Sequence, residues 1–277
     1  MSDGRFSGMV ALVTGAARGQ GRSHAQQLAR EGADVIAIDI CADIPAVPYD
    51  QATPAQLAET AGLVRAAGRR AVAAQADVRD ADGLRSAVDA AVAELGRLDV
   101  VIANAGIIQL KPALDLTAED WQTVIDVNLT GSWNTIRAGL PHMLERGGGS
   151  VVITSSAAGV KGPQNMAHYA ASKSGLLGLM RSLANEFGPR GVRVNCVLPT
   201  TVDTDMVQWA EAYRAFRPDL EAPGRADVEP VFASLNVLPV PWIQPADVTS
   251  AVCWLASPEA RYVTGVALPV DAGTVIK

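Results

Sequence analysis

Two side chains able to exchange protons stand four residues apart in the stretch Tyr-Ala-Ala-Ser-Lys, which ends at Lys173. On a helix, this spacing places Tyr169 and Lys173 on the same face, one turn apart. The ordinary pKa of a tyrosine is about 10, and a neighbouring ammonium lowers it because it stabilises the phenolate. We therefore expect Tyr169 to act as an acid and a base near neutral pH.

Two more polar residues precede this pair. Ser156 follows a predicted strand, 13 residues before Tyr169, where its hydroxyl could hold a carbonyl or alcohol oxygen. Asn128 lies inside a predicted helix, a position that asparagine disfavours. Each residue also has an ordinary interpretation, as an exposed helix pair, a turn serine or an asparagine bonded to backbone. Together, behind a dinucleotide-binding turn, they indicate reversible hydride transfer.

A glycine-rich turn follows the first aliphatic run of the chain, residues 10–14. Glycines let the backbone bend sharply and approach a ligand closely, and the next helix offers free N–H groups to a pyrophosphate. A tight turn of small residues is the alternative, but the flanking strand and helix favour dinucleotide binding. The residues expected to bind the cofactor here are Gly15, Arg18, Gly19, Gln20 and Gly21.

The second aliphatic run, residues 34–39, ends in an acidic residue 18 positions after Gly21. A carboxylate there accepts hydrogen bonds from the adenosine ribose and repels a 2′-phosphate, so Asp39 favours NAD over NADP. Ile40 and Cys41 follow, bring no positive charge, and are expected to border the cofactor. A helix N-cap or loop aspartate is the alternative.

Ligands in open α/β sheets bind at the carboxyl ends of the strands. This rule adds five expected cofactor contacts after the third and fourth strands: Asp77, Val78, Asn104, Ala105 and Gly106.

The elements that must position these residues are short aliphatic runs without strict alternation, which indicate strands buried on both faces. Helix-like segments alternate with them, which indicates right-handed crossovers and a parallel sheet covered on both sides. The predicted strands are 10–14, 34–39, 71–75, 100–103, 150–154, 193–198 and 266–270. The predicted helices are 20–31, 54–67, 81–95, 118–145, 168–187 and 246–256. The fold class is therefore α/β, a doubly wound sheet in one domain over 1–277.

Composition narrows the possible partners. The chain has 277 residues, of which 49% are hydrophobic, so it can build a large core. Its net charge of −6 argues against nucleic acid or an anionic membrane as the main partner. We find neither the roughly 18 apolar residues of a membrane span nor a signal peptide. Three scattered cysteines and three histidines predict no disulfide framework and no metal site, which favours a reducing cytoplasm.

Two segments interrupt the rhythm of strands and helices. Residues 40–53 stand where a short turn would suffice, and residues 203–245 carry several prolines and two tryptophans. Long excursions within a compact domain are usually functional loops or lids. A solvated insertion is the alternative.

The motifs Thr-Gly-Ala-Ala-Arg-Gly-Gln-Gly, Asn-Ala-Gly, the serine at 156 and Tyr-Ala-Ala-Ser-Lys resemble the short-chain dehydrogenase/reductase family over essentially the whole chain. The resemblance implies one Rossmann-like domain with seven parallel strands, a homotetramer and a tetrad of Asn128, Ser156, Tyr169 and Lys173. It implies that Tyr169 removes the alcohol proton while hydride passes to NAD, and that Lys173 bonds the nicotinamide ribose. Ser156 would position the substrate oxygen, and Asn128 would hold a water that relays protons.

The segment after the sixth strand also resembles the family, which implies that Val202 and Thr204 bind the nicotinamide carboxamide. The family usually has Pro-Gly at its start, whereas Thr200 replaces that glycine here. This departure leaves the local backbone path open.

Gly19-Gln20-Gly21, the 40–53 insertion and the Pro-Thr-Thr-Val-Asp-Thr-Asp-Met segment resemble a narrower group, the mycofactocin-associated, carveol-dehydrogenase-like subfamily. That resemblance implies that the insertion covers an NAD that stays bound between turnovers, and that electrons leave through mycofactocin. A loop directly after Asp39 lies beside the adenosine half and could slow cofactor release. A loop that never touches NAD is the alternative.

We expect the substrate cavity above the nicotinamide to be apolar and to fit a secondary alicyclic or terpenoid alcohol or its ketone. Its expected lining is Ala157, Gln164, Met166, Met206, Trp209 and Trp242, although the tryptophans could equally belong to the core, and Phe216 is a further apolar candidate. His168 points away from Tyr169 on a helix and is read as structural or interfacial.

Two other functions remain open at this point. A reductase of 3-oxoacyl thioesters would share the tetrad, but its chemistry normally draws on NADPH, which Asp39 disfavours. A non-catalytic protein that senses NAD or serves as a scaffold is the other, and an intact tetrad argues against it.

Overall fold

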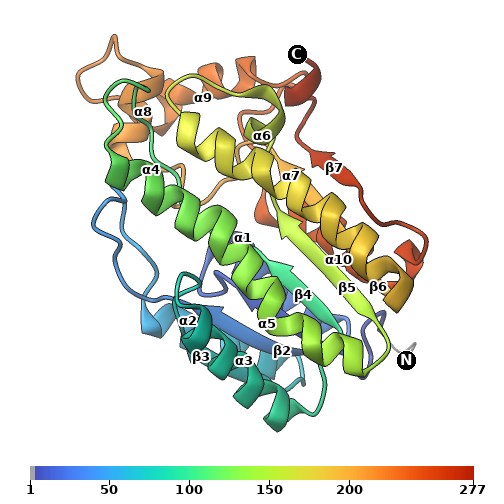
Figure 1. Cartoon of the computed structure of the whole chain (residues 1–277). Helices are drawn as coiled ribbons and strands as arrows, with labels where there is room; N and C mark the ends of the chain where they lie inside the picture. The colour runs from blue at the N-terminus through green and yellow to red at the C-terminus, as the bar shows by residue number, and fades with distance from the viewer. Residues whose placement is uncertain (1–3) are drawn as a thin grey trace.

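The computed structural model describes residues 4–277 and contains one parallel sheet, in the order β3-β2-β1-β4-β5-β6-β7 (Figure 1). The strands are β1 (Val10–Thr14), β2 (Asp34–Asp39), β3 (Ala71–Gln75), β4 (Val100–Ala103), β5 (Gly149–Thr154), β6 (Val192–Pro199) and β7 (Ala267–Val270). Each predicted strand lies within about one residue of an observed one. The predicted fold class, a single Rossmann-like domain, is confirmed.

Helices cover both faces of the sheet (Figure 1). They are α1 (Gly19–Arg30), α2 (Pro54–Ala66), α3 (Ala81–Leu95), α4 (Ala118–Ile125), α5 (Gly131–Glu145), α6 (Ala158–Lys161), α7 (Ala167–Phe187), α8 (Ala210–Phe216), α9 (Arg225–Ser234) and α10 (Pro245–Ala256). Single 3-10 turns occupy Gly188–Arg190, Pro258–Ala260 and Thr274–Ile276. No helix within residues 4–277 is both long and apolar enough to cross a membrane.

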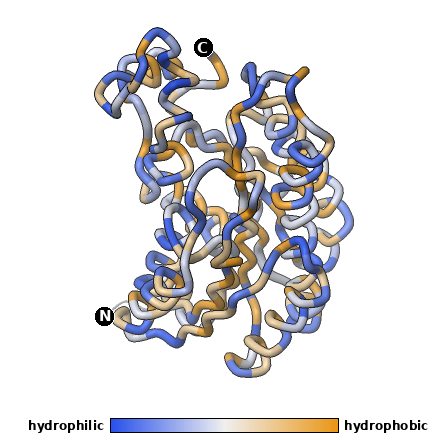
Figure 2. Tube along the Cα trace, turned by 90° about the vertical axis from the view of Figure 1, so that its left-hand side faces the viewer, coloured by the Kyte–Doolittle hydropathy of each residue, from blue (hydrophilic) through white to orange (hydrophobic). Residues whose placement is uncertain are grey.

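Alternate residues of each central strand enter two different cores. Leu12 and Val101 face a core built with α3, α5 and α7, whereas Val13 and Ile102 face a core built with α1, α2 and α10. Both faces of the strands are therefore apolar, and strict polar alternation is absent from the sequence. Figure 2 shows this as a hydrophobic centre between more hydrophilic helices.

The sheet has a topological switch point between β1 and β4. The chain runs from β1 outward to β3 and then returns to the other side of β1, so neighbouring connections leave β1 and β4 in opposite directions. A crevice forms at the carboxyl ends of such strands, and ligands bind there. The strand order alone therefore places the site at this end of the sheet.

The structure differs from the prediction of one long helix over 118–145. A π-helical turn, Asp126–Thr130, separates α4 from α5 and carries Asn128. The backbone N–H of Gly131 bonds the carbonyl of Asp126, five residues back, so one extra residue is accommodated in the turn. π turns are frequent at functional sites, and the sequence pattern, which has the period of an α-helix, does not reveal this one.

The 203–245 excursion contains two helices that the sequence prediction missed, α8 and α9, and it lies above the carboxyl end of the sheet (Figure 1). We call this segment the lid. A small separate core of Val228, Phe232 and Trp242 supports it. Val202 pairs with Ile243 in an isolated parallel bridge and so joins the two ends of the lid.

Candidate active site

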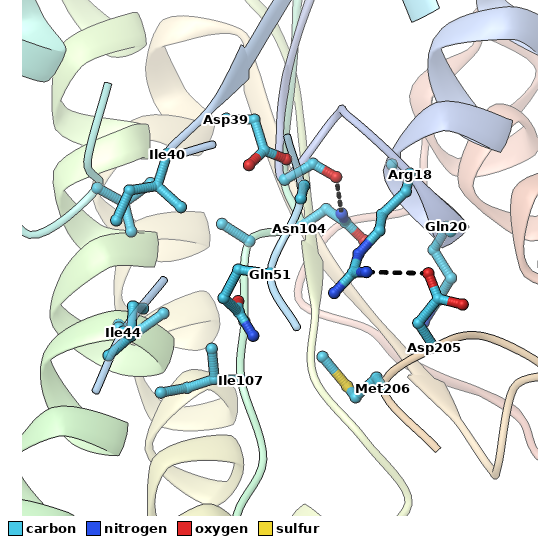
Figure 3. Close-up of a pocket in the computed structure, with 18 of the residues that line it drawn as sticks. Arg18, Gln20, Asp39, Ile40, Ile44, Gln51, Asn104, Ile107, Asp205 and Met206 are labelled. Atoms are coloured by element: carbon cyan, nitrogen blue, oxygen red, sulfur yellow. Dashed lines mark hydrogen bonds and ion pairs between the residues drawn. The ribbon is translucent and has the colours of Figure 1, made fainter. Parts of the chain in front are cut away.

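A cavity at the switch point collects most of the residues expected to bind the cofactor (Figure 3). The structure places thirteen of them on its wall: Gly15, Arg18, Gly19, Gln20, Gly21, Asp39, Ile40, Asp77, Val78, Asn104, Ala105, Gly106 and Thr204. They come from the turn after β1 and from the ends of β2, β3, β4 and β6. We call this space the cofactor cavity.

The glycine turn has the local geometry of an anion cradle. Gly15 and Gly19 have φ values of 66° and 54°, which favour glycine. A Cβ at Gly21 would stand 2.0 Å from the carbonyl oxygen of Gly15, so a side chain there is excluded. No side chain of residues 4–277 caps the N-terminus of α1, and its first turn has no acidic residue. The open N–H groups fit a pyrophosphate.

Gln20 gives a second reason to expect a dinucleotide in this cavity. Its Oε1 atom is buried and has no hydrogen-bond partner among the residues that the structure describes. Buried acceptors are rarely left unpaired. Gln20 borders both the cofactor cavity and a second cavity beside it, so a ligand that spans the junction could supply the missing donor.

Asp39 is held in place by two backbone groups. Its carboxylate oxygens accept hydrogen bonds from Ala17 N at 3.0 Å and from Cys41 N at 3.1 Å. Each oxygen has a further lone pair, and the side chain borders the cavity. It can therefore accept ribose hydroxyls while its charge disfavours a phosphate.

Cys41 differs from the expectation. Its backbone has a φ of 48°, and its side chain packs into the core beneath α1 and α2 instead of bordering the cofactor cavity. The sharp bend after Asp39 explains the difference, because it turns the chain toward residues 42–53 and leaves Ile40 at the cavity.

Residues 40–53, which we call the strap, lie along one wall of the cofactor cavity (Figure 3). Ile44, Tyr49, Gln51 and Ala52 border it, and sequence reasoning named none of these four. Tyr49 is nine-tenths buried, and its hydroxyl accepts a hydrogen bond from Ile108 N at 3.2 Å. A tyrosine among several aliphatic residues of the insertion was the available signal.

The strap and the lid meet over the cofactor cavity. The rings of Tyr49 and Trp209 stack with centroids 5.6 Å apart. The guanidinium of Arg18 bonds the carbonyl oxygen of Asp50 and pairs with Asp205 at 3.0 Å (Figure 3). Gln109 Nε2 donates to the carbonyl oxygen of Ala46 from below. The strap is therefore fixed to the glycine turn, to the loop after β4 and to the lid.

A second cavity of about 380 Å³ lies beside the first and contains the residues expected to do chemistry. Ser156, Tyr169 and Lys173 all border it. Tyr169 and Lys173 come from α7, and Ser156 follows β5 by two residues. The Lys173 ammonium lies 5.6 Å from the centre of the Tyr169 ring and donates to the carbonyl oxygen of Thr154 at 2.9 Å. The predicted pair thus shares one helix face.

The pKa of Tyr169 differs in direction from the expectation. Burial raises the pKa of Tyr169, and the Ser156 hydroxyl offsets only part of that effect. Burial also lowers the pKa of Lys173 to about 8. The reason is that both groups have lost water, while the ammonium faces the tyrosine ring and bonds Thr154 rather than the phenol oxygen.

Asn128 does not border either cavity. Its Oδ1 accepts from Ile107 N at 2.8 Å, and its Nδ2 donates to Ile107 O at 3.0 Å and to Ser172 Oγ at 3.1 Å. It therefore fastens the loop after β4 to the helix that carries Tyr169 and Lys173. The Lys173 ammonium and Asn128 Oδ1 both lie close to Gly106, where a Cβ would meet them at 3.4 and 3.3 Å.

His168 is wholly buried and bonds Gln109 Oε1 through Nε2 at 3.0 Å. This agrees with a structural role and leaves no exposed surface for an interface. Within residues 4–277, no group of three or more His, Cys, Asp or Glu side chains could hold a metal ion.

The second cavity has an apolar lining with a few polar groups, so we call it the substrate cavity. Four of the six expected substrate residues border it, together with Val202: Ala157, Gln164, Met166 and Met206. Phe216, also expected there, borders the cavity too, whereas sequence reasoning missed other lining residues, among them Ile108, Leu110, Thr200, Leu235 and Thr274. They lie far apart in the chain, and only the fold brings them together.

The two tryptophans lie elsewhere, so the expectation that they line the substrate cavity is corrected. Trp242 packs on Phe232 in the core of the lid, with the Arg225 guanidinium 4.2 Å above its ring. Trp209 stacks on Tyr49, and its Nε1 donates to the carbonyl oxygen of Met206 at 2.9 Å. Each large ring has a packing partner that the sequence does not reveal.

A dinucleotide cradle that opens onto a buried tyrosine and lysine and a half-buried serine defines a dinucleotide-dependent oxidoreductase. The sequence model that describes short chain dehydrogenases matches residues 9–214. The chain belongs to the short-chain dehydrogenase family, as its motifs predict.

Relatives with related names match this chain over nearly their full length. A (−)-trans-carveol dehydrogenase of Rhodococcus erythropolis is 52% identical, with 99% of each chain covered. A carveol dehydrogenase of Mycobacterium avium, solved in complex with NAD, is 54% identical and superimposes with a TM-score of 0.98, over 99% of this chain and 100% of that one. An uncharacterized NAD-dependent oxidoreductase of Mycobacterium tuberculosis is 44% identical, with 98% of each chain covered. The predicted use of NAD agrees with these relatives.

Replacing Tyr169 tests the acid/base assignment. Alcohol oxidation needs the unprotonated phenolate, and ketone reduction needs the protonated phenol. Because burial holds the pKa of Tyr169 above its ordinary value, kcat/KM for oxidation should rise from pH 7 to pH 9, whereas reduction should not. Tyr169→Phe should lower turnover by about 10²–10⁴-fold while NAD still binds. A flat oxidation profile, or unchanged turnover in Tyr169→Phe, would contradict the assignment.

Replacing Asp39 tests cofactor choice. Asp39→Ala should weaken NAD binding by about tenfold or more, since hydrogen bonds to a charged group contribute roughly 1.5–3 kcal/mol, and it should improve NADP binding. Titration of each nucleotide by protein fluorescence measures both. Asp39→Asn is the matched control, because it keeps the size of the side chain but not its charge. A wild-type protein that already prefers NADP would show the ribose argument to be wrong.

Proposed function

We propose that this chain is an NAD-dependent dehydrogenase that interconverts a secondary alcohol and its ketone. The observation that carries the proposal is the shared wall of the two cavities. Gln20, Asn104, Gly106, Thr204 and Met206 border both, so a nicotinamide at the inner end of the cofactor cavity would face the substrate. NAD, when bound there, supplies the acceptor for the hydride.

The residues of the chain handle the proton and the orientation of the substrate. Tyr169 takes the alcohol proton during oxidation and returns it during reduction. Ser156 holds the substrate oxygen beside it. Lys173 uses one N–H for Thr154, which leaves two for a ribose and for proton exchange. Asn128 keeps the loop and helix in register, and we assign to its π turn the water that links Lys173 to solvent. Val202 and Thr204 hold the carboxamide.

An apolar alicyclic alcohol of the carveol type is the substrate class that we propose. Methionines at 166 and 206 give the cavity an adaptable apolar wall, and two relatives are named carveol dehydrogenases. A 3-oxoacyl thioester reductase is less well supported, because Asp39 at the cofactor cavity disfavours NADPH.

We further propose that NAD stays bound between turnovers and passes its electrons to mycofactocin. The strap contacts described above support retention, because three elements fasten it along the cavity. Dissociation of NAD would require the strap or the lid to open, and such openings limit many enzymes.

Tyr49 tests retention of the cofactor. NAD should copurify with the protein, survive dialysis and exchange slowly with labelled NAD, while turnover proceeds with an artificial electron acceptor. Tyr49→Leu removes both the hydroxyl contact and the ring stacking, so exchange should quicken by tenfold or more. Tyr49→Phe keeps the stacking and should have an intermediate effect, and Tyr213→Phe is a control away from the strap. Free exchange in the wild type would remove the proposal of trapped NAD without affecting the dehydrogenase assignment.

A homotetramer is the assembly that we propose, because the chain exposes large apolar residues on two separate faces. Trp121 and Trp133 are 42% and 43% exposed on α4 and α5, whereas Trp254 and Tyr262 are 37% and 88% exposed beside α10. Two different isologous contacts generate a tetramer with dihedral symmetry. The cysteines are free and buried, which supports a reducing compartment, and we propose the cytoplasm.

Light scattering tests the assembly. The mass in solution should be about four times 28.9 kDa. Trp133→Glu and Tyr262→Glu should each break one contact and leave a dimer, because a charge is costly in an apolar interface. A monomeric wild type would contradict this, and an unchanged mass in both variants would place the contacts elsewhere.

A further inference from the structure

Thr200 stands at the end of β6, where the family resemblance leads one to expect glycine. Its backbone N–H donates to Val270 O at 3.2 Å, which continues the pairing of β6 with β7. Its φ does not lie in the left-handed region, which among non-glycine residues holds Cys41, Asn165 and Ala272. The backbone path is therefore ordinary, and what the substitution adds is a side chain.

That side chain belongs to a cluster of three polar residues: Thr200, Asn236 and Thr274. Thr200 Oγ1 donates to Asn236 Oδ1 at 3.1 Å and lies 2.8 Å from Thr274 Oγ1. Thr274 Oγ1 also lies within hydrogen-bond distance of Asn236 Oδ1 and of Asp271 O, and its single proton serves one of these acceptors. Asn236 is 2% exposed, so its amide oxygen depends on these hydroxyls for its hydrogen bonds.

The cluster joins three segments that are distant in the sequence. Thr200 directly follows strand β6 of the sheet. Asn236 lies in the second half of the lid, and Thr274 begins the C-terminal turn. Asn236 Nδ2 donates to Val240 O at 2.7 Å, which closes the 236–240 loop on itself. Val237 N and Leu238 N both donate to Ala272 O, at 2.9 and 3.0 Å. Lys277 Nζ donates to Asn236 O at 2.6 Å.

One side of this assembly is a wall of the substrate cavity. Thr200, Leu235 and Thr274 all border the cavity. The hydroxyls of the two threonines find their hydrogen-bond partners within the cluster and at Asp271 O, so a substrate meets mainly carbon at this wall. The position of Leu235 follows the position of Asn236, because the two are adjacent in the chain.

We propose that Thr200 is a specificity-determining positioning residue. Through Asn236 and Thr274 it fixes residues 235–240 and the C-terminal turn against the sheet, and it thereby sets how large an alcohol the substrate cavity accepts. The proposal rests on the proposed alcohol dehydrogenase function for its substrates, but not for the structural role of the cluster.

Amide hydrogen exchange tests the structural role without turnover. Thr200→Val keeps the shape of the side chain but removes the donor, so the amides of Val237 and Leu238 should exchange at least tenfold faster. Thr200→Ser restores the hydroxyl and should restore wild-type protection. Thr201→Val is the matched control: Thr201 borders the same cavity, its hydroxyl makes no hydrogen bond with residues 4–277, and protection of 235–240 should be unchanged. Equal protection in Thr200→Val and the wild type would overturn the proposal.

Substrate competition tests the specificity role. We compare kcat/KM for cyclohexanol and for a cyclohexanol with a branched substituent at ring position 4. Thr200→Val should shift the ratio at least fivefold toward the larger alcohol, mainly through KM, with kcat within twofold and the NAD content unchanged. Thr200→Ser should keep the wild-type ratio.

The outcomes separate this proposal from the proposed function. An unchanged ratio in Thr200→Val, or a Thr200→Ser variant that behaves like it, would overturn the specificity role. If the wild type oxidises neither alcohol, the proposed substrate class fails. The role of Thr200 is then decided by the amide exchange alone.

Discussion

The site depends on one asparagine that ties together the ends of three neighbouring strands. Asn104 Nδ2 donates to Thr14 O at 3.0 Å, and its backbone N–H donates to Thr14 Oγ1 at 3.2 Å, which joins β4 to β1. Its Oδ1 accepts from Thr154 Oγ1 at 3.2 Å, which joins β4 to β5. The carbonyl oxygen of Thr154 in turn holds the Lys173 ammonium. The glycine turn is thus one hydrogen bond from this amide and Lys173 is two, and the switch point gives the amide its place between them.

The protonation behaviour of Tyr169 and Lys173 follows from their burial away from water. Lys173 is 3% exposed and Tyr169 is 9% exposed. Removing water costs the charged form of each group, which is why burial raises the pKa of Tyr169 and lowers the pKa of Lys173. A small further change, such as a charge placed in the cofactor cavity, acts in the same low-dielectric surroundings and has a larger effect than it would in water. The acid/base role that we propose for Tyr169 needs this sensitivity.

The sequence predicts the scaffold well because the scaffold depends on local patterns. Short runs rich in aliphatic residues locate all seven strands, and the glycines at 15, 19 and 21 locate the turn. The sequence is less informative where a side chain chooses between two partners. Trp209 and Trp242 are equally apolar in the sequence, yet one stacks on the strap and the other builds the lid core. The π turn at Asn128 shares its pattern with an ordinary helix, and the direction of the Tyr169 pKa depends on burial that spacing alone does not give.

The correction at Trp209 also explains what the strap needs from the lid. The strap has no helix or strand of its own, so it requires partners outside itself to stay ordered against its entropy. Tyr49 meets this need by packing between Trp209 and the loop after β4, with its hydroxyl satisfied by Ile108 N. Arg18 adds a charged link from the glycine turn to Asp50 and Asp205. The covering of the cofactor cavity is therefore not a property of the insertion alone. It arises from an aromatic pair that connects the insertion to the lid and from Arg18, which bonds the insertion at Asp50 O and pairs with the lid at Asp205. The lid is in turn fixed to the sheet and the C-terminal turn by Thr200, Asn236 and Thr274.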